Sequence, residues 1–259
     1  MGDHGRMQST GSEVPASADA PHPHFNRRVT SFRARRSTIS GNQQATWDRL
    51  WPQLGRQARD GDNPAGPLDT DAWFGRHAPV VLEIGCGTGT STLAMAQAEP
   101  DIDVVAVEVY RRGLAQLLSA IDRASETNPV PNIRLVRGDG VDVLTSMFGP
   151  DSLTGVRVFF PDPWPKARHH KRRLLQPDTV ALIADRLRPG GVLHAATDHQ
   201  GYAEHIAEVG DAEPRLRRVP VDPEHTGGLP ISVARPVTKY ERKALAGPVV
   251  TELLWEKAP

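Results

Sequence analysis

The chain has 259 residues, with 31 Lys and Arg against 31 Asp and Glu, so its formal net charge is zero. This length suits one α/β domain with extensions. Neutrality excludes a global field that would attract nucleic acid, so any such affinity has to come from local patches. The single cysteine, Cys86, excludes an internal disulfide and a cysteine-built zinc site, and it fits a reducing compartment.

Residues 1–23 lack the apolar core of a signal peptide, and no apolar run approaches membrane-spanning length. We therefore expect a cytoplasmic protein without membrane contact. We also expect a monomer, with a homodimer as the alternative. Residues 1–25 are rich in Gly, Ser, Ala, Pro and His, a composition typical of disorder. An arginine cluster follows at residues 27–36. We predict a disordered, basic extension over residues 1–40 and one domain over residues 41–259.

Apolar periodicity predicts the elements of this domain in chain order. A short helix is expected over residues 43–54 and a loop over residues 55–78. Apolar runs then predict strands at 80–84, 104–107, 133–136, 156–160 and 192–196, and amphipathic stretches predict helices at 91–98, 112–123, 141–148 and 179–187. Pro189-Gly190-Gly191 should end the last of these helices. A further helix after Asp198 and an antiparallel edge strand at 249–255 complete a mostly parallel α/β sheet with helices on both faces.

Residues 80–90, Val-Val-Leu-Glu-Ile-Gly-Cys-Gly-Thr-Gly-Thr, place a glycine-rich turn after the first strand. Gly85 and Gly87 would let the backbone approach a ligand, and Gly89 would let the next helix pack against the strand. The third glycine falls one residue earlier than in dinucleotide sites, and Glu83 would repel a pyrophosphate. Glu83 suits a cation, so we infer S-adenosylmethionine, which has a sulfonium and an amino group but no phosphate. The alternatives are another nucleotide, and a salt-bridged strand end for Glu83.

Two further acids end the second and third strands. Glu108 is placed to accept both ribose hydroxyls, with a solvated strand-end acid as the alternative. Asp139, within Arg-Gly-Asp-Gly at 137–140, is placed to accept from an adenine amino group or to cap the following helix. Both roles of Asp139 are compatible.

The fourth strand runs into Phe-Phe-Pro-Asp-Pro-Trp-Pro-Lys at residues 159–166. Prolines on both sides restrict Asp162 to extended conformations, which would hold its carboxylate toward the methyl donor. Trp164 offers a ring face to a base or a cation. The alternative is a rigid turn that packs two aromatic side chains.

A basic run follows this loop and consists of Lys166, Arg168, His169, His170, Lys171, Arg172 and Arg173. Its position beside the candidate loop of a neutral chain favours phosphate binding over a merely solvated surface. No second ligand set with suitable spacing accompanies the two histidines, so no metal site is expected. Asp198 closes the fifth strand at the same edge. Thr238, Lys239, Tyr240 and Glu241 suit recognition of a base edge, with a polar turn as the alternative.

Together these segments resemble the bacterial tRNA (guanine-N7-)-methyltransferases, from about residue 43 to the end of the chain. The most specific matches are Phe-Phe-Pro-Asp-Pro-Trp-x-Lys-x-Arg-His-x-Lys-Arg-Arg at 159–173, Ala-Thr-Asp at 196–198, Tyr-Ala-Glu-His at 202–205 and Arg-Pro-x-Thr-Lys-Tyr-Glu at 235–241. The resemblance implies a Rossmann-like class I S-adenosylmethionine-dependent methyltransferase with a mostly parallel seven-stranded sheet. It also implies methyl transfer to N7 of guanine 46 in the variable loop of tRNA. Pro165 stands where some relatives carry His.

The resemblance further implies that Glu83, Glu108, Asp139 and Asp162 bind the donor and that Asp162 is also catalytic. It implies substrate contacts at Lys166, Asp198 and residues 238–241, and RNA contacts at residues 168–173. Three alternatives are a methyltransferase for a small molecule or another RNA, a non-catalytic RNA-binding protein on this scaffold, and a nicotinamide-dependent oxidoreductase. The presence of all four acids disfavours the second, and the glycine spacing with Glu83 disfavours the third.

Overall fold

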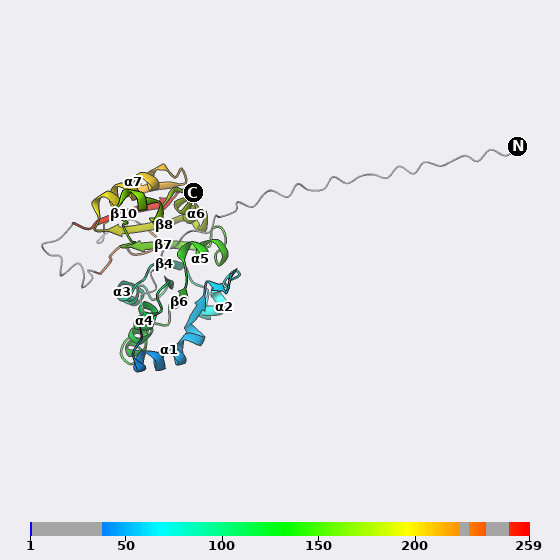
Figure 1. Ribbon diagram of the computed structural model, residues 1–259, viewed down its shortest axis with the longest axis vertical. Helices are drawn as coiled ribbons and strands as arrows, with labels where there is room; N and C mark the ends of the chain where they lie inside the picture. The colour runs from blue at the N-terminus through cyan, green and yellow to red at the C-terminus, as the bar shows by residue number, and fades with distance from the viewer. Residues whose placement is uncertain (2–37, 223–227, 237–248) are drawn as a thin grey trace. The chain divides into compact units, whose positions relative to one another are not determined.

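The computed structural model describes Met1 and residues 38–222, 228–236 and 249–259. The predicted basic extension over residues 1–40 lies almost entirely outside these ranges, and so do Thr238, Lys239, Tyr240 and Glu241, so both stay predictions. Within the described ranges, one large sheet carries helices on both faces (Figure 1).

The large sheet has eight strands in the order β1-β6-β5-β4-β7-β8-β10-β9. Their bounds are Gly55–Gln57 for β1, Ile133–Arg137 for β6, Asp103–Glu108 for β5, Val80–Ile84 for β4, Leu153–Phe159 for β7, Leu187–Thr197 for β8, Thr251–Lys257 for β10 and Leu216–Val219 for β9. Neighbours from β1 to β8 are parallel, whereas β10 is antiparallel to β8 and β9. The predicted mostly parallel α/β sheet is confirmed, with eight strands where the resemblance implied seven. Strands β1 and β9 were not among those predicted from apolar runs.

The predictions for the two sheet edges need correction. Strand β10 lies inside the sheet, because β9 pairs with its other side, Leu254 opposite Val219. Residues 55–78, predicted as a loop, contain β1, a small hairpin of β2 (Arg59–Asp60) and β3 (Asn63–Pro64), and the helix α2 (Thr70–Phe74). These elements span two to five residues each. They are too short to show a period in the sequence.

Helices cover the two faces as distinct groups. On one face, α1 (Gly41–Leu54), α3 (Thr90–Ala98) and α4 (Arg111–Ala124) pack against β5 and β6. On the other face, α5 (Gly140–Ser146), α6 (Pro177–Arg186) and α7 (Gln200–Ala212) pack over the central strands. The predicted helices are confirmed to within a few residues. Pro189-Gly190-Gly191, expected to end a helix, instead lies inside β8 at a register shift against β7.

A segment without helix or strand, residues 228–236, covers the remaining part of the first face. Ile231 and Val233 of this segment are buried against β4, β8 and β10. A Cβ on Gly155 of β7 would lie only 2.6 Å from Cδ1 of Ile231, so glycine is what lets the segment approach the sheet. In the sequence, this segment precedes residues 238–241.

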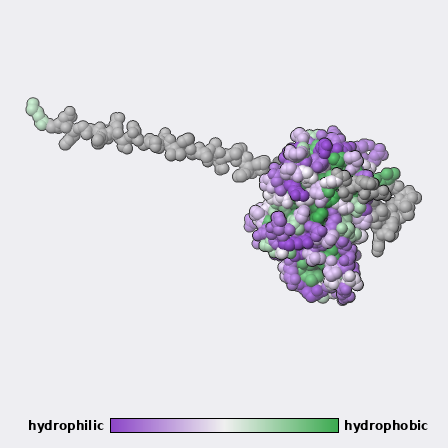
Figure 2. Space-filling view, turned by 180° about the vertical axis from the view of Figure 1, so that it is seen from behind, coloured by the Kyte–Doolittle hydropathy of each residue, from purple (hydrophilic) through white to green (hydrophobic). Residues whose placement is uncertain are grey.

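The face shown in Figure 2 is mostly hydrophilic, with apolar residues in small separated areas. Among the described residues, the exposed large hydrophobic side chains are Met1 and Val249. No helix in the described part of the chain is both long and apolar enough to cross a membrane.

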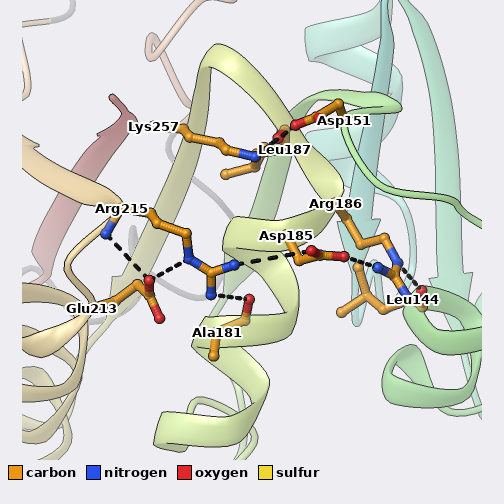
Figure 3. Close-up of polar contacts among 9 residues, drawn as sticks. All are labelled: Leu144, Asp151, Ala181, Asp185, Arg186, Leu187, Glu213, Arg215 and Lys257. Carbon is orange, nitrogen blue, oxygen red and sulfur yellow. Dashed lines mark hydrogen bonds and ion pairs between the residues drawn. The ribbon is translucent and has the colours of Figure 1, made fainter. Parts of the chain in front are cut away.

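Ion pairs join the elements at the amino-terminal ends of β7 and β8 (Figure 3). Lys257 donates to Asp151 at 2.6 Å and to the carbonyl of Leu187 at 2.7 Å. Arg215 donates to Glu213 at 2.6 Å and to the carbonyl of Ala181 at 2.8 Å. These contacts tie the end of β10 to the starts of β7 and β8, and the residue before β9 to α6, at the edge opposite the strands' carboxyl ends.

Candidate functional site

The carboxyl ends of the parallel strands bring the predicted acids to one edge of the sheet. Glu83 lies in β4, Glu108 ends β5, Asp139 follows β6, Asp162 follows β7 and Asp198 follows β8. Backbone bonds join the neighbouring loops: the Gly138 N–H donates to the Glu108 carbonyl at 3.1 Å, and the Phe160 N–H donates to the Ala196 carbonyl at 2.8 Å. This is the edge at which ligands of parallel α/β sheets bind.

The glycine turn between β4 and α3 is open to a ligand. Gly85, Gly87 and Gly89 have φ values of 81°, 56° and 75°, which strain any L side chain. A Cβ on Gly85 or Gly87 would meet no atom within 4 Å. At Gly89 a Cβ would lie 2.5 Å from Cδ1 of Leu117 on α4. Gly89 therefore lets α3 pack against α4, and not against the strand as predicted.

Glu108 is held by this turn. Its Oε2 accepts from the Gly87 N–H at 3.1 Å, and its Oε1 accepts from the Tyr110 N–H at 2.9 Å. Burial raises the pKa of Glu108; the Tyr110 and Gly87 N–H groups oppose the rise and the nearby Asp162 carboxylate adds to it. Each carboxylate oxygen keeps lone-pair capacity for another donor. The geometry therefore fits the predicted pair of ribose hydroxyls.

Glu83 is a buried carboxylate that the described part of the protein does not fully satisfy. It is 3% exposed, and its Oε2 has no hydrogen-bond partner among the described residues. Burial raises the pKa of Glu83, while the nearby Thr92 hydroxyl and the Arg157 guanidinium oppose the rise. Among the described residues, neither the Oε2 of Glu83 nor the hydroxyl of Thr92 makes a hydrogen bond of normal geometry. Such an oxygen beside an open glycine turn fits the cationic amino group of S-adenosylmethionine.

Asp139 and Asp198 occupy loops that begin helices. The Oδ1 of Asp139 accepts from the Val141 N–H at 2.8 Å and caps α5, so the capping role is present and the adenine contact stays a prediction. Asp198 is half-buried directly after β8. The next residue, His199, caps α7 by accepting from the Tyr202 N–H at 3.2 Å.

The loop formed by residues 160–164 carries Asp162 away from the end of β7. Phe160 and Trp164 have φ values of 51° and 44°, uncommon for residues other than glycine. Asp162 itself is exposed. The Trp164 ring lies 5.1 Å from the guanidinium carbon of Arg172 and contacts His169 edge-on at 5.8 Å between ring centroids. A cation of the protein's own thus lies over the ring that was predicted to face a base or a cation.

The basic run forms a short 3-10 helix, η1 (Ala167–Arg172), directly after this loop. Its exposed cations, together with the residue before it, are Lys166, Arg168, Lys171 and Arg172, whereas His169 and His170 are half-buried. Desolvation and then the cations of Arg172, Arg168 and Lys166 lower the pKa of His169. The four exposed cations concentrate positive charge at this short helix, and three of them add to the lowering; such a charge suits a polyanion.

Arg173 departs from the predicted RNA-binding set. It is 2% exposed, its Nε donates to the Pro163 carbonyl at 2.8 Å, and its NH1 donates to the Gly201 carbonyl at 3.2 Å. Its guanidinium also lies over the ring of Tyr202 at 4.8 Å. These internal contacts leave Arg173 inside the protein, where a phosphate cannot reach it.

A buried polar network next to the site was not predicted. The NH2 of Arg157 donates to Glu99 at 2.6 Å, and Arg235 pairs with Glu252 at 3.1 Å. Burial lowers the pKa of His194, whose Nε2 lies 2.9 Å from Glu252. A carboxylate can only accept, so this nitrogen carries the proton. In the sequence, a charged Arg157 inside the apolar run 156–160 and a His194 inside the run 192–196 are the features that could have predicted buried polar contacts here.

Among the described residues, no group of three or more His, Cys, Asp and Glu side chains is arranged to hold a metal ion.

The chain is similar to known methyltransferases. Residues 77–249 match a family model described as "Putative methyltransferase". The chain is 84% identical to a tRNA (guanine-N(7)-)-methyltransferase of Mycolicibacterium gilvum (strain PYR-GCK), over 100% of both chains. It is 64% identical to the protein of that name from Mycobacterium avium (strain 104), over 98% of this chain and 99% of the relative. The solved 16S rRNA methyltransferase KamB aligns at 18% identity and a TM-score of 0.47, over 77% of this chain and 98% of that chain.

The two full-length relatives and the family model agree with the resemblance read from residues 159–173, 196–198, 202–205 and 235–241. The chain therefore belongs to the bacterial tRNA (guanine-N7-)-methyltransferase family.

Proposed function

We propose that this protein transfers the methyl group of S-adenosylmethionine to N7 of guanine 46 in the variable loop of tRNA, giving 7-methylguanosine. The observation that carries the proposal is Glu83. It is a buried carboxylate beside an open glycine turn, at the sheet edge that also holds Asp162. The names of the full-length relatives support guanine N7 of tRNA as the acceptor.

The donor would be held by the carboxylates at the ends of β4, β5 and β6. Glu83 would accept from the amino group, Glu108 from the ribose hydroxyls and Asp139 from the adenine amine. Gly85 and Gly87 would leave room for the donor because their α-carbons face open space. When bound, S-adenosylmethionine supplies an electrophilic methyl group on a positively charged sulfur.

N7 of guanine already has an in-plane lone pair and no proton, so attack on the methyl group needs no base. Catalysis by the protein then consists of alignment and management of charge. Asp162 is exposed at the edge and close enough to Glu108 to raise its pKa. We assign Asp162 the role of orienting the guanine through its N1–H or amino group and of stabilising the positive charge that moves onto the ring.

The acceptor RNA would contact η1. Lys166, Arg168, Lys171 and Arg172 are exposed directly after the Asp162 loop, so they would hold phosphates while the base reaches the donor. Guanine 46 stacks in the folded core of tRNA, and its access requires local opening or flipping at a cost in stacking. Asp198 and residues 238–241 are proposed to contact the base.

The test is mass-spectrometric mapping of 7-methylguanosine. Purified full-length protein is incubated with S-adenosylmethionine and an unmodified tRNA transcript that carries guanine 46, and a second transcript carries adenine at that position. We expect one 7-methylguanosine, at position 46 of the first transcript only. Modification at another guanine would reject the assigned position, and no modification of any tRNA would reject the function.

A further inference from the structure

Arg173 and Arg235 lie at opposite ends of the loop formed by residues 160–164, and the side chains of both are almost fully buried. Arg173 is 2% exposed, and the side chain of Arg235 is 3% exposed. By sequence, Arg173 belongs to the basic run and Arg235 to the segment that leads to residues 238–241. A buried guanidinium needs internal partners, so its partners reveal its role.

Arg173 holds the end of the loop. Its Nε donates to the carbonyl of Pro163 at 2.8 Å, and its NH1 donates to the carbonyl of Gly201 at the start of α7. Its guanidinium lies over the ring of Tyr202, whose hydroxyl accepts from the Leu175 N–H at 3.1 Å. One side chain thus joins the loop to α7 and to the chain that follows η1.

Arg235 holds the start of the loop. Its guanidinium carbon lies 5.0 Å from the ring centroid of Phe160 and 5.7 Å from that of Phe159. Its NH2 pairs with Glu252 on β10 at 3.1 Å, and Glu252 also meets His194 on β8 at 2.9 Å. Arg235 therefore joins the loop to the last two long strands.

The backbone of the loop between these two arginines makes few hydrogen bonds that would fix its conformation. Phe160 and Trp164 both have positive φ, a conformation that persists only where the surroundings impose it. Pro161 and Pro163 have no N–H to donate. The exposed Asp162 lies between them, so the direction of its carboxylate depends on how the two ends of the loop are held.

We propose that Arg173 and Arg235 are positioning residues that clamp the Asp162 loop from both ends and set the direction of its carboxylate. Neither arginine contacts RNA or donor in this role, although Arg173 belongs to the basic run whose exposed members are proposed to hold phosphates. The proposal rests on the proposed function, because the clamp matters for methyl transfer through Asp162.

The test compares Arg173→Met, Arg235→Met and the conservative variants Arg173→Lys and Arg235→Lys in the full-length protein. We expect kcat to fall by about tenfold or more in each Met variant, since a misplacement of about 1 Å at a reacting centre costs about a hundredfold. The dissociation constant of S-adenosylhomocysteine should stay within about twofold, because the donor contacts lie elsewhere. The Lys variants should recover part of kcat, since an ammonium keeps one donor and the charge but loses the flat fork.

Two matched controls separate clamping from RNA binding and from general stability. Lys171→Met, an exposed neighbour, should raise KM for tRNA and flatten the salt dependence of binding, whereas Arg173→Met should leave that salt slope unchanged. Arg218 on β9 also has its guanidinium over a ring, with its central carbon 5.2 Å from the ring centroid of Trp255. It pairs with Asp211 on α7 at 2.8 Å. Arg218→Met should lower Tm without changing kcat or KM.

The stoichiometry of S-adenosylhomocysteine binding, measured by calorimetry, gives the fraction of each variant that is folded. Division of the measured rate by this fraction keeps a loss of folded protein from being mistaken for a loss of kcat. Wild-type kcat in both Met variants, or a flattened salt slope in Arg173→Met, would overturn the clamp. If a Met variant does not fold, its Lys variant carries the test, and an unchanged kcat there overturns the proposal. A wild-type protein that forms no 7-methylguanosine would instead reject the proposed function.

Discussion

Glu83 on β4 and Arg157 on β7 are register partners in adjacent strands, yet Arg157 pairs with Glu99 and not with Glu83. The Arg157–Glu99 distance is 2.6 Å, and the other oxygen of Glu99 accepts from the Ser232 N–H at 2.6 Å. Glu83 thus has a positive charge nearby, while its Oε2 has no hydrogen-bond partner in the described ranges. A buried carboxylate in this state is prepared for a cationic ligand.

Replacement of Glu83 by Gln should weaken donor binding and stabilise the free protein. Hydrogen bonds to charged groups contribute about 1.5–3 kcal/mol, so the dissociation constant of S-adenosylhomocysteine should rise about tenfold or more. Burial raises the folded-state pKa of Glu83 above its unfolded value. Its contribution to stability is therefore present below the unfolded pKa and lost as pH rises through the folded pKa. Tm of Glu83→Gln should exceed that of wild type above the folded pKa and match it at low pH.

The matched control for this experiment is Glu99→Gln. It removes the carboxylate that pairs with the buried Arg157 guanidinium, which costs about 3–5 kcal/mol of stability, so the Tm of Glu99→Gln should fall where that of Glu83→Gln rises. Unchanged donor affinity in Glu83→Gln would contradict the assigned role of Glu83.

Asp162→Ala should separate donor binding from turnover. Asp162 is exposed on the loop after β7, and the donor retains Glu83, Glu108 and the glycine turn. We expect S-adenosylhomocysteine to bind with an affinity close to that of wild type, while kcat falls about a hundredfold or more, as for loss of a group that stabilises developing charge. Calorimetry and a methyl-transfer assay on the same preparation measure both quantities. Full activity in Asp162→Ala would remove this residue from the mechanism.

Neutralisation of Arg168, Lys171 and Arg172 together should flatten the salt dependence of tRNA binding. For each phosphate that the variant can no longer neutralise, the slope of log Kd against log salt should decrease by about 0.7–0.9. The measurement is a titration of tRNA binding between low and physiological salt. Arg217→Gln, exposed on β9 and paired with Glu256, should leave the slope unchanged. An unchanged slope in the triple variant would place the RNA elsewhere.

The Glu213–Arg215 pair should stabilise the protein only at pH values that keep Glu213 ionised. The hydrogen bond from Arg215 lowers the pKa of Glu213, against a smaller opposing effect of burial. A depressed pKa means that this stability is present above the unfolded pKa and is lost as pH falls through the folded pKa. Arg215→Met should cost about 0.5–1 kcal/mol at neutral pH, because the pair is partly exposed, and the difference should shrink in acid. Denaturant unfolding at neutral and acid pH measures this, and a pH-independent difference would contradict it.

The sequence alone determined the parts whose chemistry is local. Alternating apolar runs and amphipathic stretches predicted the order of β4 to β8 and their helices, because the periods of strands and helices are properties of consecutive residues. The glycine spacing beside Glu83 and the acid at Glu108 predicted a donor site at one edge, because parallel strands share the direction of their carboxyl ends. Residues 159–173, 196–198, 202–205 and 235–241 together carry the family resemblance as consecutive residues of the chain.

The tertiary structure alone decided which charges face inward. Arg172 and Arg173 are indistinguishable in the basic run, yet one is exposed and the other is buried against Pro163 and Tyr202. The absence of a side chain at Gly89 leaves room for Leu117 of α4. The guanidinium of Arg235 lies over the ring of Phe160, which is 75 positions earlier in the chain. These contacts join residues far apart in sequence, so they depend on how the sheet, α4, α7 and the 228–236 segment pack together, and no local pattern of residues contains that information.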